Sequence, residues 1–102
     1  MEKIIWSEQA RDDLKLIYEY IFRDSPKYAD ITIDNIIEVT EKLEIFPFSG
    51  RIIPELKKED IRELIYGNYR IIYHLIDDNV RILTVFHSAR LFDNVDLSMI
   101  IA

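Results

Sequence analysis

The feature that most constrains the fold is a pair of alternating runs near the C-terminal end of the chain. Residues 69–76 and 80–87 are rich in Ile, Val, Tyr and Phe, and the polar segment Asp77-Asp78-Asn79 separates them. Alternation with a period of two, interrupted by Asp and Asn, is typical of a β-hairpin. The two-residue loop is either Asp78-Asn79 or Asp77-Asp78. Both choices put the same residues on the same face, because side chains alternate strictly along a strand.

The alternation divides this hairpin into two faces of different character. One face is expected to be core and carries Tyr69, Ile71, Tyr73, Leu75, Val80, Ile82, Thr84 and Phe86. The other mixes cations with aliphatic side chains and carries Arg70, Ile72, His74, Ile76, Arg81, Leu83, Val85 and His87. A face of the second kind is too apolar to remain bare, since exposed patches of this type mark interfaces. We therefore expect a partner to cover it.

Two helical stripes precede the hairpin. The first follows a short apolar run at residues 2–6, with Ser7 as its N-cap, and the second begins at Ser25-Pro26. Their apolar positions recur at spacings of three and four, at Ala10, Leu14, Ile17 and Ile21 and then at Ala29, Ile33, Ile36, Thr40 and Leu43. The charged residues Arg11, Asp12 and Asp13 are expected to point away from the first stripe. The tight polar turn between the stripes predicts a helical hairpin.

The segment between the helices and the hairpin contains a loop and one more strand. Residues 48–59 read as an irregular loop, residues 60–66 alternate again, and Gly67-Asn68 is a hairpin turn. Pairing across that turn puts Glu63 diagonal to Arg70. The Arg70 side chain could therefore form an ion pair with Glu63 or bind a partner, and the sequence favours neither role over the other. The order β-α-α-β-β-β predicts a single α+β domain over residues 1–102. In it, a helical hairpin packs on one face of a small antiparallel sheet.

Composition and charge narrow the class of protein. The chain has 102 residues, no cysteine and a net charge of −6. The absence of cysteine fits a reducing compartment. The N-terminus has no signal-peptide pattern and no run is long enough to span a membrane, so we expect a cytoplasmic protein. An acidic chain repels nucleic acid, whose binding proteins are usually basic, and the charge therefore favours a protein partner.

Five segments, in this order, resemble the RelE/ParE superfamily of toxins from bacterial toxin–antitoxin pairs. They are Ile5-Trp6-Ser7 with Ala10-Arg11-Asp12-Asp13-Leu14, then Pro47-Phe48-Ser49-Gly50-Arg51, Arg62-Glu63-Leu64, Tyr69-Arg70-Ile71-Ile72-Tyr73, and Val85-Phe86-His87 followed by Arg90. The resemblance implies a small toxin that a cognate antitoxin protein neutralises in a hetero-oligomer. It implies neither a cofactor nor a membrane.

The superfamily contains two activities. RelE-like and YoeB-like members cleave messenger RNA in the ribosomal A site. The resemblance to them puts Arg70 at the scissile phosphate, Glu55 in the place of the general base, and His87 one residue out of register with a catalytic histidine. No Tyr follows Arg90, although that branch carries a C-terminal Tyr or His. ParE-like members inhibit DNA gyrase, and the long helical hairpin and the His-x-x-Arg strand end resemble them more closely.

We therefore expect a ParE-like inhibitor of DNA gyrase. One alternative is a ribosome-dependent endonuclease, for which Glu55, Arg70 and His87 are the candidate catalytic residues. Another is an inert relative that binds only its antitoxin. The expected partner-binding residues are Arg70, Ile72, His74, Leu83, Val85, His87 and Arg90. No metal site is expected, because His74 and His87 lack the further carboxylate or thiolate ligands that such a site needs.

Overall fold

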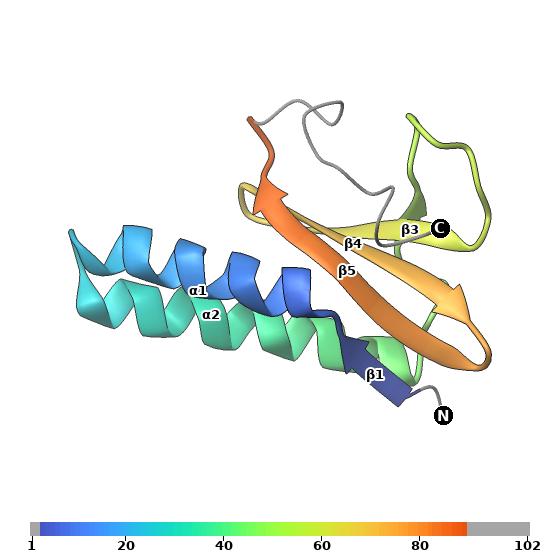
Figure 1. Ribbon diagram of the computed structural model, residues 1–102, viewed down its shortest axis with the longest axis horizontal. Helices are drawn as coiled ribbons and strands as arrows, with labels where there is room; N and C mark the ends of the chain where they lie inside the picture. The colour runs from blue at the N-terminus through green and yellow to red at the C-terminus, as the bar shows by residue number, and fades with distance from the viewer. Residues whose placement is uncertain (1–2, 90–102) are drawn as a thin grey trace.

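The computed structural model describes residues 3–89, so Arg90 lies outside the described residues. Two helices form the hairpin, α1 (Glu8–Phe22) and α2 (Pro26–Glu41), and a short 3-10 turn, η1 (Lys42–Glu44), extends the second. The strands are β1 (Lys3–Trp6), β2 (Arg51–Ile52), β3 (Ile61–Tyr66), β4 (Tyr69–Ile76) and β5 (Asn79–His87). Figure 1 shows the helical hairpin lying along the sheet and extending beyond one end of it.

The five strands form one sheet in the order β1-β5-β4-β3-β2. The pairs from β2 to β5 are antiparallel, as expected, whereas β1 pairs with β5 in parallel and makes the sheet mixed. The parallel pairing follows from the helical hairpin, which carries the chain from β1 back to the start of the β-meander. The predicted α+β fold with helices on one face is confirmed.

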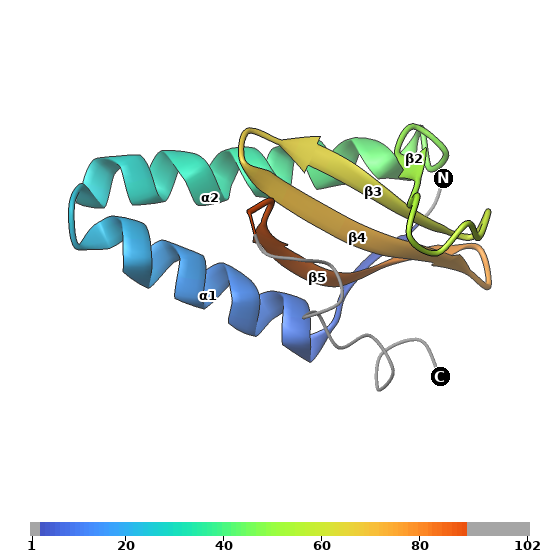
Figure 2. The ribbon, with the colours of Figure 1, turned by 90° about the horizontal axis from the view of Figure 1, so that it is seen from above.

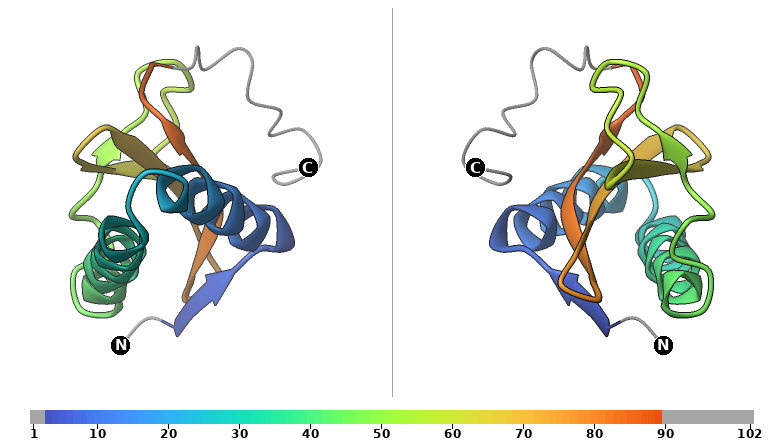
Figure 3. Two further views of the ribbon diagram at one scale, coloured as in Figure 1. Left: turned by 90° about the vertical axis from the view of Figure 1, so that its left-hand side faces the viewer. Right: turned by 90° about the vertical axis from the view of Figure 1, so that its right-hand side faces the viewer.

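Each helix begins where the sequence predicts. The Ser7 hydroxyl accepts a hydrogen bond from the Ala10 N–H at 3.0 Å, and the Ser25 hydroxyl accepts one from the Tyr28 N–H at 3.1 Å. From above, the helices meet at their short turn and diverge toward the sheet (Figure 2). The twist of the sheet is visible end on (Figure 3), and α1 packs along β5 while α2 reaches β3.

The hairpin loop is Asp77-Asp78, with φ of 51° and 59°, and Ile76 pairs with Asn79. Two successive residues with positive φ make the turn whose twist matches the flanking strands. Asp and Asn tolerate this backbone conformation better than other side chains do. The sequence left open whether the loop is Asp78-Asn79 or Asp77-Asp78, and in the structure it is Asp77-Asp78.

A β-bulge in β5 changes the pattern of faces. Ile72 pairs with Thr84 but Tyr73 pairs with Ile82, so Leu83 is an extra residue on the β5 side. Beyond the bulge the alternation is reversed. Val85 and His87 therefore lie on the helix-covered face and Phe86 lies on the other, and the predicted placement of these three residues was wrong. Strict alternation fails because two residues of β5 oppose one residue of β4.

The sheet is covered on both faces by the chain itself. On the helix side, one cluster contains Ala10, Ile36, Leu43, Ile71, Tyr73, Val80, Ile82 and Val85. On the opposite side, the connection between β2 and β3 folds back over the sheet, and a second cluster contains Ile53, Ile61, Ile72, Leu83 and Phe86 with Leu56 at its margin. The sequence predicted that a partner covers this face, but Ile53 and Leu56 of the protein's own loop cover the apolar side chains of the second cluster.

Candidate functional site

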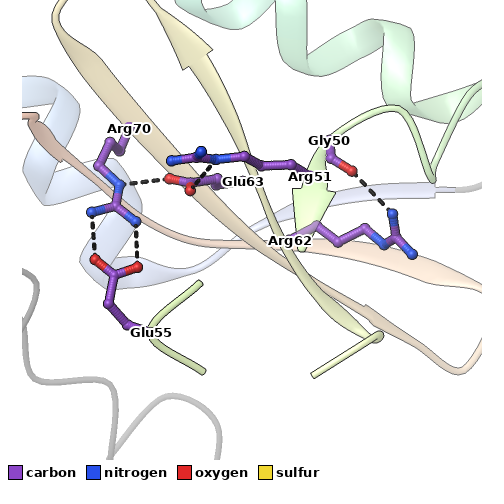
Figure 4. Close-up of polar contacts among 6 residues, drawn as sticks. All are labelled: Gly50, Arg51, Glu55, Arg62, Glu63 and Arg70. Atoms are coloured by element: carbon purple, nitrogen blue, oxygen red, sulfur yellow. Dashed lines mark hydrogen bonds and ion pairs between the residues drawn. The ribbon is translucent and has the colours of Figure 1, made fainter. Parts of the chain in front are cut away.

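Four charged side chains form a continuous ion-pair network on the loop-covered side of the sheet. The Glu63 carboxylate accepts from Arg51 Nε at 2.7 Å and from Arg70 Nε at 2.5 Å. The Nη1 and Nη2 atoms of Arg70 each donate to one oxygen of Glu55 at 3.1 Å. Figure 4 shows the two carboxylates on adjacent edges of the Arg70 guanidinium. The network places two positive charges and two negative charges in contact.

The strand register explains how the network forms. Glu63 is opposite Ile72 and Ile65 is opposite Arg70, so Glu63 and Arg70 are diagonal neighbours on one face. The ion pair between them, one of the two roles that the sequence left open for Arg70, is therefore present. Glu55 reaches Arg70 from the loop that covers this face, between Ile53 and Leu56, which pack on the second cluster. The sequence grouped Glu55 and Arg70 with His87 as candidate catalytic residues, but it did not predict the direct contact between Glu55 and Arg70.

Burial makes the inner pair of the network different from the outer pair. The side chain of Glu63 is completely buried and that of Arg70 is 11% exposed, whereas Glu55 is 38% and Arg51 60% exposed. The Arg70 guanidinium also lies 5.5 Å from the centre of the Phe86 ring. Hydrogen bonds to Glu55 and then to Glu63 raise the pKa of Arg70, and the same contact with Arg70 lowers the pKa of Glu55. Each oxygen of Glu55 accepts a hydrogen bond from Arg70, and the lowered pKa makes this carboxylate a weaker base.

Arg62 and Gly50 fix the loop that leads into this network. Arg62 donates to the carbonyl oxygen of Gly50 at 3.0 Å, and its guanidinium lies 4.9 Å from the Phe48 ring centre. The Gly50 N–H donates to the Tyr73 hydroxyl, and a Cβ at position 50 would lie 2.5 Å from that oxygen. Only glycine permits this approach. Phe48 and Gly50 thus give the Pro47-Phe48-Ser49-Gly50-Arg51 motif a role in packing.

The third candidate catalytic residue is on the other face of the sheet. His87 is paired with Tyr69, their rings meet edge to face at 5.6 Å, and they line a groove with Leu16, Ile17 and Tyr20 of α1. Arg70 and Phe86, one residue along each strand, point to the opposite face. The structure therefore brings Glu55 and Arg70 together and separates both from His87.

The remaining predicted partner-binding residues differ in accessibility. Ile72 and Leu83 are completely buried and Val85 is 2% exposed, so these three do not present themselves to a partner. The side chain of His74 is 13% exposed, and its Nε2 lies 3.0 Å from a carboxylate oxygen of Asp60. This contact lowers the pKa of Asp60. Arg70, His74 and His87 remain predicted contact residues, on two different faces.

Asp13 looks like a candidate functional residue, but its contacts in the structure give it a structural role. It is 9% exposed, and its carboxylate accepts a 3.0 Å hydrogen bond from the Val85 N–H and a shorter one from the Thr84 hydroxyl. The prediction that Asp13 points away from the apolar stripe was wrong. Its position three residues after Ala10 and four before Ile17 places it on the buried face of α1, and this spacing was the available signal.

Two other kinds of site find no support in the part of the chain that the structure describes. Among residues 3–89, no group of three or more His, Cys, Asp or Glu side chains lies close enough together to hold a metal ion. Neither α1 nor α2 is long and apolar enough to cross a membrane.

Comparison with known proteins identifies the family. A profile described as "ParE toxin of type II toxin-antitoxin system, parDE" matches residues 4–92. The protein named Toxin RelE2 from Caulobacter vibrioides is 32% identical over 92 residues, which are 89% of this chain and the whole of that protein. A solved structure titled "Chromosomal ParDE TA system from P. aeruginosa" has the same fold, with a TM-score of 0.70 and 21% identity, over 85% of this chain and 96% of the other. The chain belongs to the ParE family of toxins from type II toxin–antitoxin systems.

Proposed function

We propose that this protein is a cytoplasmic toxin that inhibits DNA gyrase and is neutralised by a cognate antitoxin protein. One observation carries the choice of target: the candidate catalytic residues are not assembled, because His87 lies on the opposite face of the sheet from Arg70 and Glu55. Cleavage of RNA without a metal needs a base, an acid and a cation at one phosphate. The acidic net charge of −6 also disfavours a function that depends on holding RNA.

A ribosome-dependent endonuclease is the second candidate, and one contact favours it. Glu55 and Arg70 are hydrogen-bonded through two atoms each, so a carboxylate and a cation already lie side by side. One relative of this chain also bears the name RelE2. Against this candidate, the pKa of Glu55 is lowered by Arg70, whereas a general base works best with a pKa near the pH of the reaction.

Two assays with the same purified protein distinguish these targets. We expect it to inhibit supercoiling by purified gyrase, or to trap its cleavage complexes, and to leave messenger RNA on programmed ribosomes intact. Glu55→Gln should change gyrase inhibition little, since no proton transfer is involved. In a nuclease, the same substitution would lower the cleavage rate by about 10²-fold or more, because general base catalysis contributes that much.

The controls separate loss of activity from loss of fold. Arg70→Lys and Glu55→Gln are compared with Glu59→Gln, which removes an exposed carboxylate from the same loop. Messenger cleaved in the A site, with the cleavage abolished by Glu55→Gln, would establish the endonuclease in place of our proposal. If neither gyrase nor messenger is affected while the antitoxin still binds, the protein is an inert relative of the toxins.

The groove beside His87 is a candidate site for the antitoxin. Leu16 is 63% and Tyr20 71% exposed on the outer side of α1, and together with Tyr69 and His87 they line a groove of about 460 Å³. Exposed apolar side chains gathered along one helix are typical of a site that receives an amphipathic helix from a partner. We therefore propose that an apolar segment of the antitoxin occupies this groove.

Hydrogen exchange with and without the antitoxin checks this assignment. We expect protection in the peptides that contain residues 16–20, 69 and 87. Leu16→Glu should weaken binding by about tenfold to a hundredfold, because burial of one leucine contributes about 1.5–3 kcal/mol. Ile45→Glu is the matched control, since Ile45 is 65% exposed but lies outside the groove. Equal loss of affinity in both variants would show that the antitoxin binds elsewhere.

A further inference from the structure

Strand β1 forms one margin of the sheet and pairs with β5 on one side only (Figure 3). The Ser7 N–H donates to the Ile82 carbonyl oxygen at 3.0 Å, so the backbone groups of Ile5, two residues earlier, also point toward β5. Those of Ile4 and Trp6 point outward, because backbone groups alternate in direction along a strand. Within residues 3–89, no strand pairs with this outer edge. Such an edge is a template for pairing with another chain.

Open grooves lie beside β1 on both faces of the sheet. On the helix side, Ile4 and Trp6 line a groove of about 610 Å³ together with Leu14 and Ile37 of the two helices. On the opposite face, a groove of about 580 Å³ lies beside Ile5. Successive side chains of a strand point to opposite faces, so a strand added to β1 would place its side chains in the two grooves by turns. The edge with its two grooves therefore fits an extended segment.

The charges beside Ile5 indicate which strand fits. Glu8, Asp12 and Arg81 line the second groove and leave it with one negative charge in excess. Within residues 3–89, none of these three side chains forms an ion pair. The exposed Lys3 begins β1 and shares the face of Ile5, so the two ends of β1 carry opposite charges on this face. In an antiparallel pair the start of one strand meets the end of the other, and β1 is therefore complementary to a second copy of itself.

We propose that two copies of this protein pair through β1 in antiparallel orientation, with a two-fold axis at Ile5. Ile4 then lies opposite Trp6 of the second copy, and the two residues exchange N–H and C=O hydrogen bonds. Ile5 meets its own counterpart across the axis. The half-buried Trp6 side chain enters the helix-side groove of the other copy, and the two sheets become continuous.

The register follows from the outward residues and from the charges. Moving the axis to Ile4 or to Trp6 would leave one of these two residues without an opposite residue in β1. With the axis at Ile5, Lys3 lies opposite Ser7 of the second copy, where Glu8 begins the helix. Because of the two-fold symmetry, this contact between opposite charges occurs twice in the dimer. A single register thus satisfies both the backbone edge and the charges.

Analytical ultracentrifugation of the isolated protein tests the pairing with two charge reversals. Lys3→Glu brings negative charges together at both contacts, and Glu8→Lys brings positive charges together there. Each variant alone should dimerise about tenfold more weakly than the unsubstituted protein, since two exposed attractions become repulsions. An equimolar mixture of the two variants should recover the dimer, because both contacts between unlike copies are again attractive. Lys58→Glu makes the same charge change on an exposed loop position and should dimerise normally.

Amide hydrogen exchange followed by NMR provides a second readout, and circular dichroism checks that the variants keep their fold. The amides of Ile4 and Trp6 should exchange more slowly as the protein concentration rises. The amide of Ile5, which faces β5, should be protected at every concentration.

Three results would overturn the proposal. The first is a protein that stays monomeric at the concentrations used for NMR while Ile4 and Trp6 exchange freely. The second is a dimer that neither Lys3→Glu nor its mixture with Glu8→Lys affects, since it must form through another surface. The third is protection of Ile4 and Trp6 only after the antitoxin is added, which would assign the edge to a strand of the antitoxin.

Discussion

Glu63→Gln is expected to destabilise the protein by about 3–5 kcal/mol, the range measured when one partner of a buried ion pair is removed. Glu63 accepts from both Arg51 and Arg70, and its side chain is completely buried. Glutamine has the same shape but offers one oxygen and an N–H₂ group, which would face one of the two guanidinium groups. Arg70, only 11% exposed, would then keep a positive charge with less compensation. Urea or thermal unfolding, followed by circular dichroism, measures the loss.

A double substitution shows whether the uncompensated charge is the cause. Replacing a buried ion pair by apolar residues of similar size is often neutral. Glu63→Leu combined with Arg70→Met should therefore recover much of the stability that either substitution loses alone. If the double variant is as unstable as the sum of the single variants, the loss comes from packing rather than from charge.

Ile36→Ala is expected to cost about 2–5 kcal/mol, the range for truncating a buried isoleucine. Ile36 lies on α2, has no exposed surface and belongs to the cluster that joins both helices to the sheet. Its truncation leaves a cavity within that cluster, and the strands that line it are held in place by their hydrogen bonds to one another. Thermal unfolding measures the effect directly.

The matched control lies on the same helix. Ile31 is 44% exposed, so Ile31→Ala removes the same atoms from a position that is still largely in contact with water. Its cost should be below about 1 kcal/mol, as for most surface substitutions. A shift of only a degree or so for Ile36→Ala would mean that the stripe faces solvent, and it would contradict the packing of the hairpin on the sheet.

Those parts of the fold that depend on local chemistry could be predicted. Ser7 and Ser25 cap the helices because each offers a hydroxyl to N–H groups without partners, and this is visible in the sequence. The spacing of apolar residues likewise predicts both helices, and the diagonal between Glu63 and Arg70 follows from the turn at Gly67-Asn68. These features involve residues that are close in sequence or in register.

Features that depend on distant parts of the chain could not be predicted in this way. The bulge at Leu83 adds a residue to one strand without any glycine or proline to mark it, and it reverses the faces of Val85 and Phe86. The cover over Ile72 comes from a loop whose path depends on how Ile53 and Leu56 pack. The contact of Glu55 with Arg70 depends on that same path, so the candidate site was predicted as residues and not as an arrangement.

The carboxylate of Asp13 has a consequence for aggregation. β1 ends at Trp6, which pairs with Ile82, so the rest of β5 has no neighbouring strand on that side. A strand edge of this kind offers N–H and C=O groups to a strand of another molecule. Helix α1 crosses this stretch, and Asp13 takes the Val85 N–H that such a strand would need. A strand from another molecule would have to displace α1, and it would leave the charge of the Asp13 carboxylate buried against the backbone of the incoming strand. We therefore expect a variant lacking this carboxylate to form fibrils or swapped dimers more readily, even under conditions in which it remains folded.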